Sequence, residues 1–153
     1  MRETLAKALA WGEAHADFDK AVKGFPPELR GRRAHGLPHS AWELLEHLRL
    51  AQHDILDFSV NSDYAEMSWP KDYWPPTPAP PSAAAWDESL AAFRRDREAL
   101  RQLALDTSRD LTAKIPHGDG QTYLRELLLA ADHTAYHVGQ LVLVRQELGI
   151  WKR

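Results

Sequence analysis

The distribution of prolines is the feature of this sequence that most constrains its fold. Six of the ten prolines fall within residues 61–81, together with Trp69, Tyr73 and Trp74. Proline lacks a backbone donor and clashes inside a helix, so most of this segment can be neither helix nor continuously paired strand. Disordered linkers are poor in aromatic residues. We therefore expect a long ordered loop that packs over one end of the fold.

The stretches around this loop have the periodicity of amphipathic helices. Apolar residues recur at steps of three and four, and we expect four helices, over residues 3–23, 40–60, 83–105 and 122–148. Ser40 and Glu43 have the spacing of a capping box at the start of the second helix. Gly24 follows the first helix and Gly149 the fourth, as helix-terminating glycines do.

Length and composition agree with a small helical protein. The chain has 153 residues, of which 44% are hydrophobic and 27% charged, as in ordinary soluble domains. No strand pattern accompanies the four helices. The predicted fold class is all-α: one domain over residues 1–153, an antiparallel four-helix bundle with a long proline- and aromatic-rich loop between helices two and three.

Charge and cysteine content exclude several classes of function. The formal net charge is −3 and the basic residues are scattered among acids, so we expect no nucleic-acid partner. No apolar run reaches the roughly 20 residues of a membrane span, and the N-terminus does not resemble a signal peptide, so we expect no membrane partner and a cytoplasmic location. Because the chain has no cysteine, any metal site must use nitrogen and oxygen ligands.

Three histidines are candidates for such a site. His133 and His137 lie four residues apart in the most apolar predicted helix, so their side chains can converge on one ion. His47 lies on the apolar face of the second helix, whereas His53 shares a face with acidic residues and is expected to be solvated.

Burial of these histidines favours a metal. Each unsatisfied ring nitrogen in a core costs about 1–3 kcal/mol, and a coordinated cation removes that cost. Imidazole suits zinc, nickel, copper and iron, and three protein ligands with open positions are typical of catalytic centres. The alternative is a set of core histidines that bond to other polar groups.

Two segments carry a resemblance to a known family. Ser40-Ala-Trp-Glu-Leu-Leu-Glu-His47-Leu and the later Ala-Asp-His133-Thr-Ala-Tyr-His137-Val-Gly-Gln140 resemble the DinB-like family of bacterial metal-binding bundles. The resemblance implies a four-helix bundle that forms a homodimer and binds one divalent transition metal per chain, zinc or nickel first, then iron or manganese. It places the ligands at His47, His133 and His137, and it implies a small-molecule substrate or thiol, because characterised relatives are thiol-dependent transferases or isomerases.

Three further polar residues are candidates for a catalytic role. His15 follows Trp11 on the apolar stripe of the first helix and would face the metal cavity, unless it is a core histidine bonded to a carbonyl. Asp54 lies seven residues after His47 and could orient a ligand, although a solvated carboxylate is the more common situation. Gln140, and with less support Tyr136, could bond a bound ligand or simply be satisfied between helices.

Several further groups in the sequence are compatible with more than one role. The loop aromatics Trp69, Tyr73 and Trp74 either close a substrate pocket or, as we favour, hold the loop on the bundle. Three histidines are expected in loops, where the sequence does not decide their role: His35, His39 and His117. An arginine group could bind an anionic thiol or be a solvated basic patch: Arg30, Arg32 and Arg33.

Three functional hypotheses follow. The first is a metal-dependent transferase or hydrolase in which the ion activates a bound water or thiol. The second is a non-catalytic metal-binding stress or interaction protein, in which the ion locks helices two and four together. The third is a dimeric scaffold whose histidines are ordinary core polar groups and bind no metal.

Overall fold

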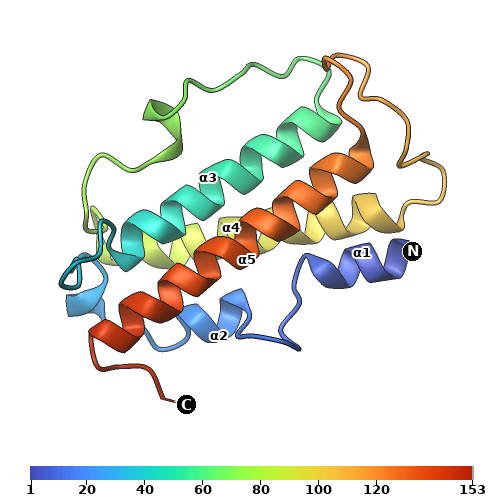
Figure 1. Ribbon diagram of the computed structural model, residues 1–153. Helices are drawn as coiled ribbons and strands as arrows, with labels where there is room; N and C mark the ends of the chain where they lie inside the picture. Colours follow the sequence, from blue (N-terminus) through green and yellow to red (C-terminus); the bar gives the residue numbers. More distant parts are fainter. Residues whose placement is uncertain (153) are drawn as a thin grey trace.

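The computed structural model describes residues 1–152, and it is built from helices (Figure 1). The α-helices are α1 (Arg2–Ala8), α2 (Phe18–Val22), α3 (Ala41–Val60), α4 (Ala83–Leu105) and α5 (Tyr123–Glu147), and two 3-10 turns are η1 (Pro27–Leu29) and η2 (Lys71–Tyr73). Over these residues no strand forms, and the isolated bridge between Lys114 and Thr122 is the one β-type pairing. The prediction of an all-α bundle with a long loop is confirmed.

The first predicted helix is not continuous. The chain leaves the helix after Ala8 and starts α2 at Phe18, where the Asp17 side chain accepts a hydrogen bond from the Lys20 N–H at 2.7 Å. Asp17 thereby caps a new helix in place of continuing the first, and caps of this kind compete with helix propagation. Trp11, expected on the buried stripe, is 48% exposed in the intervening segment. The prediction of one helix over residues 3–23 is wrong.

Helices α3 and α4 run parallel to each other. Glu46 pairs with Ser89, and seven residues later on both helices His53 pairs with Asp96. The segment between the two helices must therefore return along the whole length of α3, and it lies beside that helix (Figure 1). Our expectation that the loop would cover one end of the bundle is wrong. The parallel direction of α3 and α4 refines the antiparallel bundle that we predicted.

The helix ends are set by local caps. The Ser40 side chain accepts from the Glu43 N–H at 3.2 Å, and the Glu43 carboxylate accepts from the Ser40 N–H at 2.8 Å, which confirms the predicted capping box. At the start of α5, the Thr122 side chain accepts from the Arg125 N–H at 3.2 Å, without the reciprocal bond of a capping box. These caps fix where each helix begins, and hence which side chains face the bundle interior.

The apolar core has two parts. One part contains Trp86 and Phe93 of α4 with the first turns of α3 and the last turns of α5; the other contains Leu100 with Ile55 and the first turns of α5. On α5 the change from one part to the other falls between Ala130 and Val138. The polar residues His133 and His137 lie at this junction.

One side of α5 is exposed although it is largely apolar. Leu128, Tyr136 and Leu143 are 51%, 65% and 40% exposed, which differs from our expectation that the middle of this helix would lack a solvated face. In the described part of the chain, no helix combines the length and the apolar character that crossing a membrane requires.

Candidate metal centre

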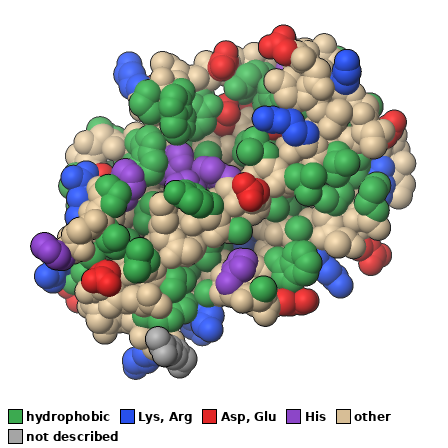
Figure 2. Space-filling model, viewed as in Figure 1, with side chains coloured by type: hydrophobic (Ala, Val, Ile, Leu, Met, Phe, Trp, Pro, Cys, Tyr) green, Lys and Arg blue, Asp and Glu red, His purple; other side chains and the backbone are tan. Residues whose placement is uncertain are grey.

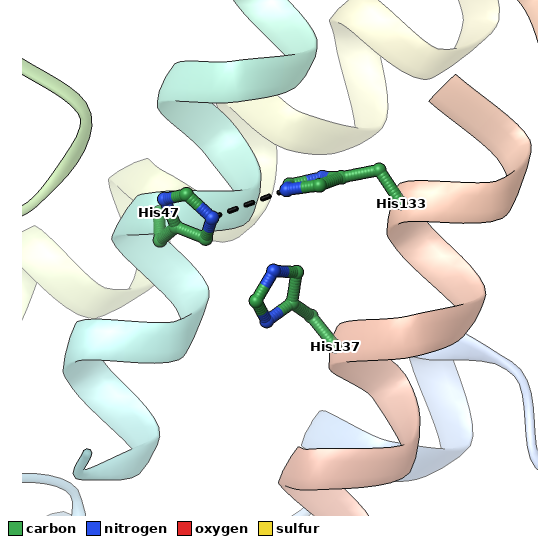
Figure 3. Close-up of side chains that lie close together, drawn as sticks. All are labelled: His47, His133 and His137. Carbon is green, nitrogen blue, oxygen red and sulfur yellow. Dashed lines mark hydrogen bonds between the residues drawn. The ribbon is translucent and has the colours of Figure 1, made fainter. Parts of the chain in front are cut away.

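The three predicted ligands come together between α3 and α5. His47 extends from α3, and His133 and His137 extend from successive turns of α5 toward it (Figure 3). One ring nitrogen from each histidine lies within 4.8 Å of the other two. The Nε2 atoms of His47 and His133 are 3.1 Å apart. Ligand nitrogens on a tetrahedral zinc ion lie about 3.3 Å apart, so this spacing fits a shared ion.

Two of the rings are held by a hydrogen bond at the nitrogen remote from the cluster. His47 Nδ1 is 2.8 Å from the backbone carbonyl oxygen of Tyr73, and His137 Nδ1 is 2.7 Å from Oε1 of Gln140. Both partner oxygens only accept, so each Nδ1 carries the proton and each Nε2 keeps its lone pair. Metal-binding histidines are oriented by partners of this kind. Gln140, a catalytic candidate from the sequence, therefore positions His137.

Burial keeps the three imidazoles neutral. Desolvation, together with the weaker effect of repulsion from His137 and His47, lowers the pKa of His133 from its ordinary value to about 3. Desolvation likewise lowers the pKa of His137 to about 4, against the opposing effect of the Gln140 hydrogen bond. Burial also lowers the pKa of His47. Neutral imidazole is the form that binds a metal, so the cluster is ready for an ion at neutral pH.

Aromatic stacking supports the ring of His47. The Trp74 ring lies parallel to the His47 ring, with centroids 3.9 Å apart and an interplanar angle of 2°. The opposite face of Trp74 stacks on His39 at 4.2 Å. Trp74 thus packs the loop onto the bundle, as we favoured. Trp69 differs, because it touches His47 only edge-on at 6.4 Å and is 68% exposed.

Asp54 is connected to the cluster through the loop. Its two carboxylate oxygens accept from the Tyr64 hydroxyl at 2.9 Å and from the Tyr73 hydroxyl at 2.7 Å. Burial, followed by the Asp54 charge, raises the pKa of both tyrosines. A simply solvated Asp54, the more common situation, is therefore wrong. The carboxylate fixes Tyr73, whose carbonyl oxygen in turn holds His47.

His15 lies away from the cluster. It sits in the exposed segment between α1 and α2, where Nδ1 is 2.8 Å from the Ala16 carbonyl oxygen. It borders a mostly apolar hollow of about 270 Å³ whose α5 wall includes Thr134 and Val138. These two residues lie about 100° around α5 from His133 and His137, so the hollow opens on another side of the helix.

The remaining histidines have local partners or are exposed. His53 is exposed but pairs with the buried Asp96 at 3.0 Å, so it is more than a solvated side chain. His117 Nε2 is 2.7 Å from the Phe58 carbonyl oxygen, near the end of α3. His35 is exposed in its loop.

The arginine group has structural contacts. Arg33 forms an ion pair with Glu43 of the capping box. The Arg30 guanidinium lies over the Trp86 ring, 4.8 Å from its centroid. Arg32 is exposed. Two of the three arginines that could bind an anionic thiol, Arg30 and Arg33, therefore contact side chains of the protein instead.

Tyr73 is the functional residue whose role the sequence did not reveal. Tyr73 holds His47 through its backbone carbonyl oxygen. Every residue type has this group, so the sequence does not mark it. The hydroxyl contact of Tyr73 to Asp54 crosses from an irregular loop to a helix, so no periodicity signals it. The proline spacing predicted an ordered loop, and this was the one available indication.

One ring of the cluster, His133, is half-buried, and the other two are buried. Histidine side chains are visible at the surface between α3 and α5, next to apolar patches (Figure 2). A cavity of about 460 Å³ is lined by Asp54, Tyr73 and Leu129 and extends to Arg125, but none of the three histidines lines it. The arrangement can therefore hold an ion, with the half-buried His133 on its more accessible side.

Comparison with known proteins adds one finding. A family model described as the DinB superfamily matches residues 10–141, which include all three histidines of the cluster. No curated protein and no solved structure matches the chain.

Proposed function

The chain belongs to the DinB superfamily, and on this premise we propose that it binds one divalent transition-metal ion through His47, His133 and His137. Zinc and nickel are the first candidates, and iron and manganese follow, because imidazole binds all of them. We further propose that the protein is a metal-dependent transferase with a thiol co-substrate, or a hydrolase. The convergence of three neutral imidazoles, two with fixed Nε2 lone pairs, is the observation that carries the proposal.

The number of ligands favours catalysis over a purely structural ion. Structural zinc takes four protein ligands, whereas catalytic zinc takes three and leaves a position for water or substrate. The cluster, as far as residues 1–152 extend, offers three such groups, and one of them, His133, is partly exposed. When bound there, a metal ion would lower the pKa of a coordinated water or thiol and polarise the substrate.

The chain's own residues hold the ligands in place. Tyr73 and Gln140 fix the rings of His47 and His137, and Trp74 shields one face of His47 from water. Asp54 acts through Tyr73, since both of its oxygens are occupied by tyrosine hydroxyls. We assign Asp54 and Gln140 to positioning rather than to proton transfer.

Metal analysis tests the binding proposal. Untagged protein, purified without a metal column and equilibrated with each of the four metals, should hold about one ion per chain after dialysis. His47→Ala and His137→Ala should hold almost none, because loss of a ligand weakens binding by at least about 100-fold. His53→Ala is the matched control, an exposed histidine of α3 outside the cluster. Wild-type protein without metal, or full retention by His137→Ala, would contradict the proposal.

Cobalt substitution separates catalysis from the non-catalytic alternative. If coordination positions are open, a small thiol added to the cobalt-loaded protein should coordinate and produce a thiolate-to-cobalt charge-transfer band. A metal-binding protein without catalysis should show a higher melting temperature with the ion but no such band. The homodimer expected from the resemblance remains a prediction, which sedimentation equilibrium tests.

A further inference from the structure

Two strongly exposed aromatic side chains border the candidate metal centre. Trp69 is 68% exposed and Tyr136 is 65% exposed. Trp69 lies edge-on to the His47 ring, and the Tyr136 ring is perpendicular to the His137 ring, with centroids 4.9 Å apart. Single exposed apolar residues are common and need no explanation. Here, however, both residues contact rings of the proposed ligands.

On α5, Tyr136 belongs to an exposed apolar row. Leu129, Tyr136 and Leu143 follow one another at seven-residue intervals, and each is at least 36% exposed. Seven residues make about two helical turns, so the three side chains lie on one line along the helix. This line runs on the solvent side of His133, because Tyr136 is about 60° from it around the axis.

On the opposite side, the loop supplies the second apolar rim. Trp69 packs against Tyr73, with ring centroids 5.3 Å apart, and the Tyr73 hydroxyl is tied to Asp54. The rim is therefore anchored to α3 rather than free. His47 contacts the loop rim and His137 contacts the α5 rim. Figure 2 shows histidines beside apolar patches.

We propose that Trp69 and Tyr136 are specificity-determining residues that bind an aromatic or heteroaromatic ring of the substrate. The same substrate would place an oxygen, nitrogen or sulfur donor at the open coordination position. This inference rests on the proposed function, because the donor needs a bound ion. Flat aromatic faces favour a planar partner through offset or edge contacts, which adds to the gain from burying its apolar surface.

A pair of chelators that differ only in the ring tests the inference. Benzohydroxamate and acetohydroxamate share one metal-binding group, and titration calorimetry on zinc-loaded protein compares their affinities. Wild type should bind benzohydroxamate at least about tenfold more tightly. Trp69→Ala, Tyr136→Ala and the double variant should reduce this ratio progressively, with zinc content and acetohydroxamate affinity unchanged. Any intrinsic difference between the chelators is common to all the proteins and remains in the double variant.

Trp11→Ala is the matched control, since Trp11 is an exposed tryptophan that borders the hollow beside His15. It should keep the full ratio. An equal ratio in wild type and double variant overturns the inference, and so does a zinc-loaded protein that binds neither hydroxamate. Dissociation of a dimer by both single variants also overturns it, because the aromatics would then form an interface. A protein without zinc overturns the proposed function, and the inference fails with it.

Discussion

The backbone carbonyl oxygen of Tyr73 lies 2.8 Å from Nδ1 of His47. The hydroxyl of the same tyrosine donates to Asp54, so the loop residue is fixed at both ends. A hydrogen bond at Nδ1 sets which nitrogen carries the proton and how the ring is oriented. The proline-rich loop thereby orients the ring of His47, which belongs to the neighbouring helix α3.

Removal of the Tyr73 hydroxyl should therefore weaken metal binding. Tyr73→Phe keeps the carbonyl group but releases the residue from Asp54, and we expect the zinc dissociation constant to rise by about tenfold. Tyr64→Phe removes the other tyrosine bond to Asp54 without touching the residue that holds His47. Competition with a chromophoric chelator measures both variants. Equal effects of the two substitutions would argue against transmission through Tyr73.

Gln140 allows a second test of ligand orientation. Gln140→Leu leaves His137 Nδ1 without its acceptor, and zinc affinity should fall by about 10–100-fold. Gln140→Glu restores an acceptor and should recover most of the affinity, because a carboxylate also accepts from Nδ1–H. The same chelator competition applies. Affinity that is unchanged in the leucine variant would show that His137 needs no partner there.

The metal-free protein should lose stability as the pH falls. The pKa values of His133 and His137 are about 3 and about 4 in the folded chain, below the ordinary 6.5. The unfolded chain therefore binds more protons between pH 4 and 6.5, and the free energy of unfolding decreases as pH drops through this window. The slope is at most about 1.4 kcal/mol per pH unit for each histidine.

Urea unfolding of the metal-free protein at pH 7.5, 6 and 5 measures this effect. The control is the double variant His133→Gln, His137→Gln, which should show a shallower pH dependence than wild type. Identical slopes would mean that these two histidines do not titrate differently in the folded and unfolded chains.

The contact between Gly31 and the loop predicts a stability difference between two glycines. A Cβ atom at Gly31 would lie 2.4 Å from the Cβ of Ala79, whereas one at Gly139 would meet nothing within 4 Å. Gly31→Ala should lower the free energy of unfolding by about 1–3 kcal/mol through overpacking. Gly139→Ala, inside α5, should raise it by about 0.5–1 kcal/mol. Urea denaturation gives both values, and a neutral Gly31→Ala would contradict the close approach.

Features with a local cause could be predicted from the sequence. The capping box at Ser40 depends on residues three apart, and the inward direction of His47 follows from helical periodicity. His133 and His137 converge because they are four residues apart. Together these patterns predicted the helical class and the three-histidine cluster.

Features that depend on irregular or distant backbone could not be predicted. The break between α1 and α2 arises where Asp17 caps a new helix, although Trp11 continues the apolar spacing across it. The parallel direction of α3 and α4 depends on pairs such as Glu46 with Ser89, which are 43 residues apart. The Tyr73 carbonyl contact likewise has no signature in residue type.

The pairing of His47 with His133 joins residues that are 86 positions apart in the chain. A loop of that length is costly in entropy to close, and contacts of this range slow the folding of a chain. An ion shared by these histidines would act as a reversible cross-link between the middle of the chain and its last helix. The protein's resistance to unfolding would then follow the free metal concentration around it.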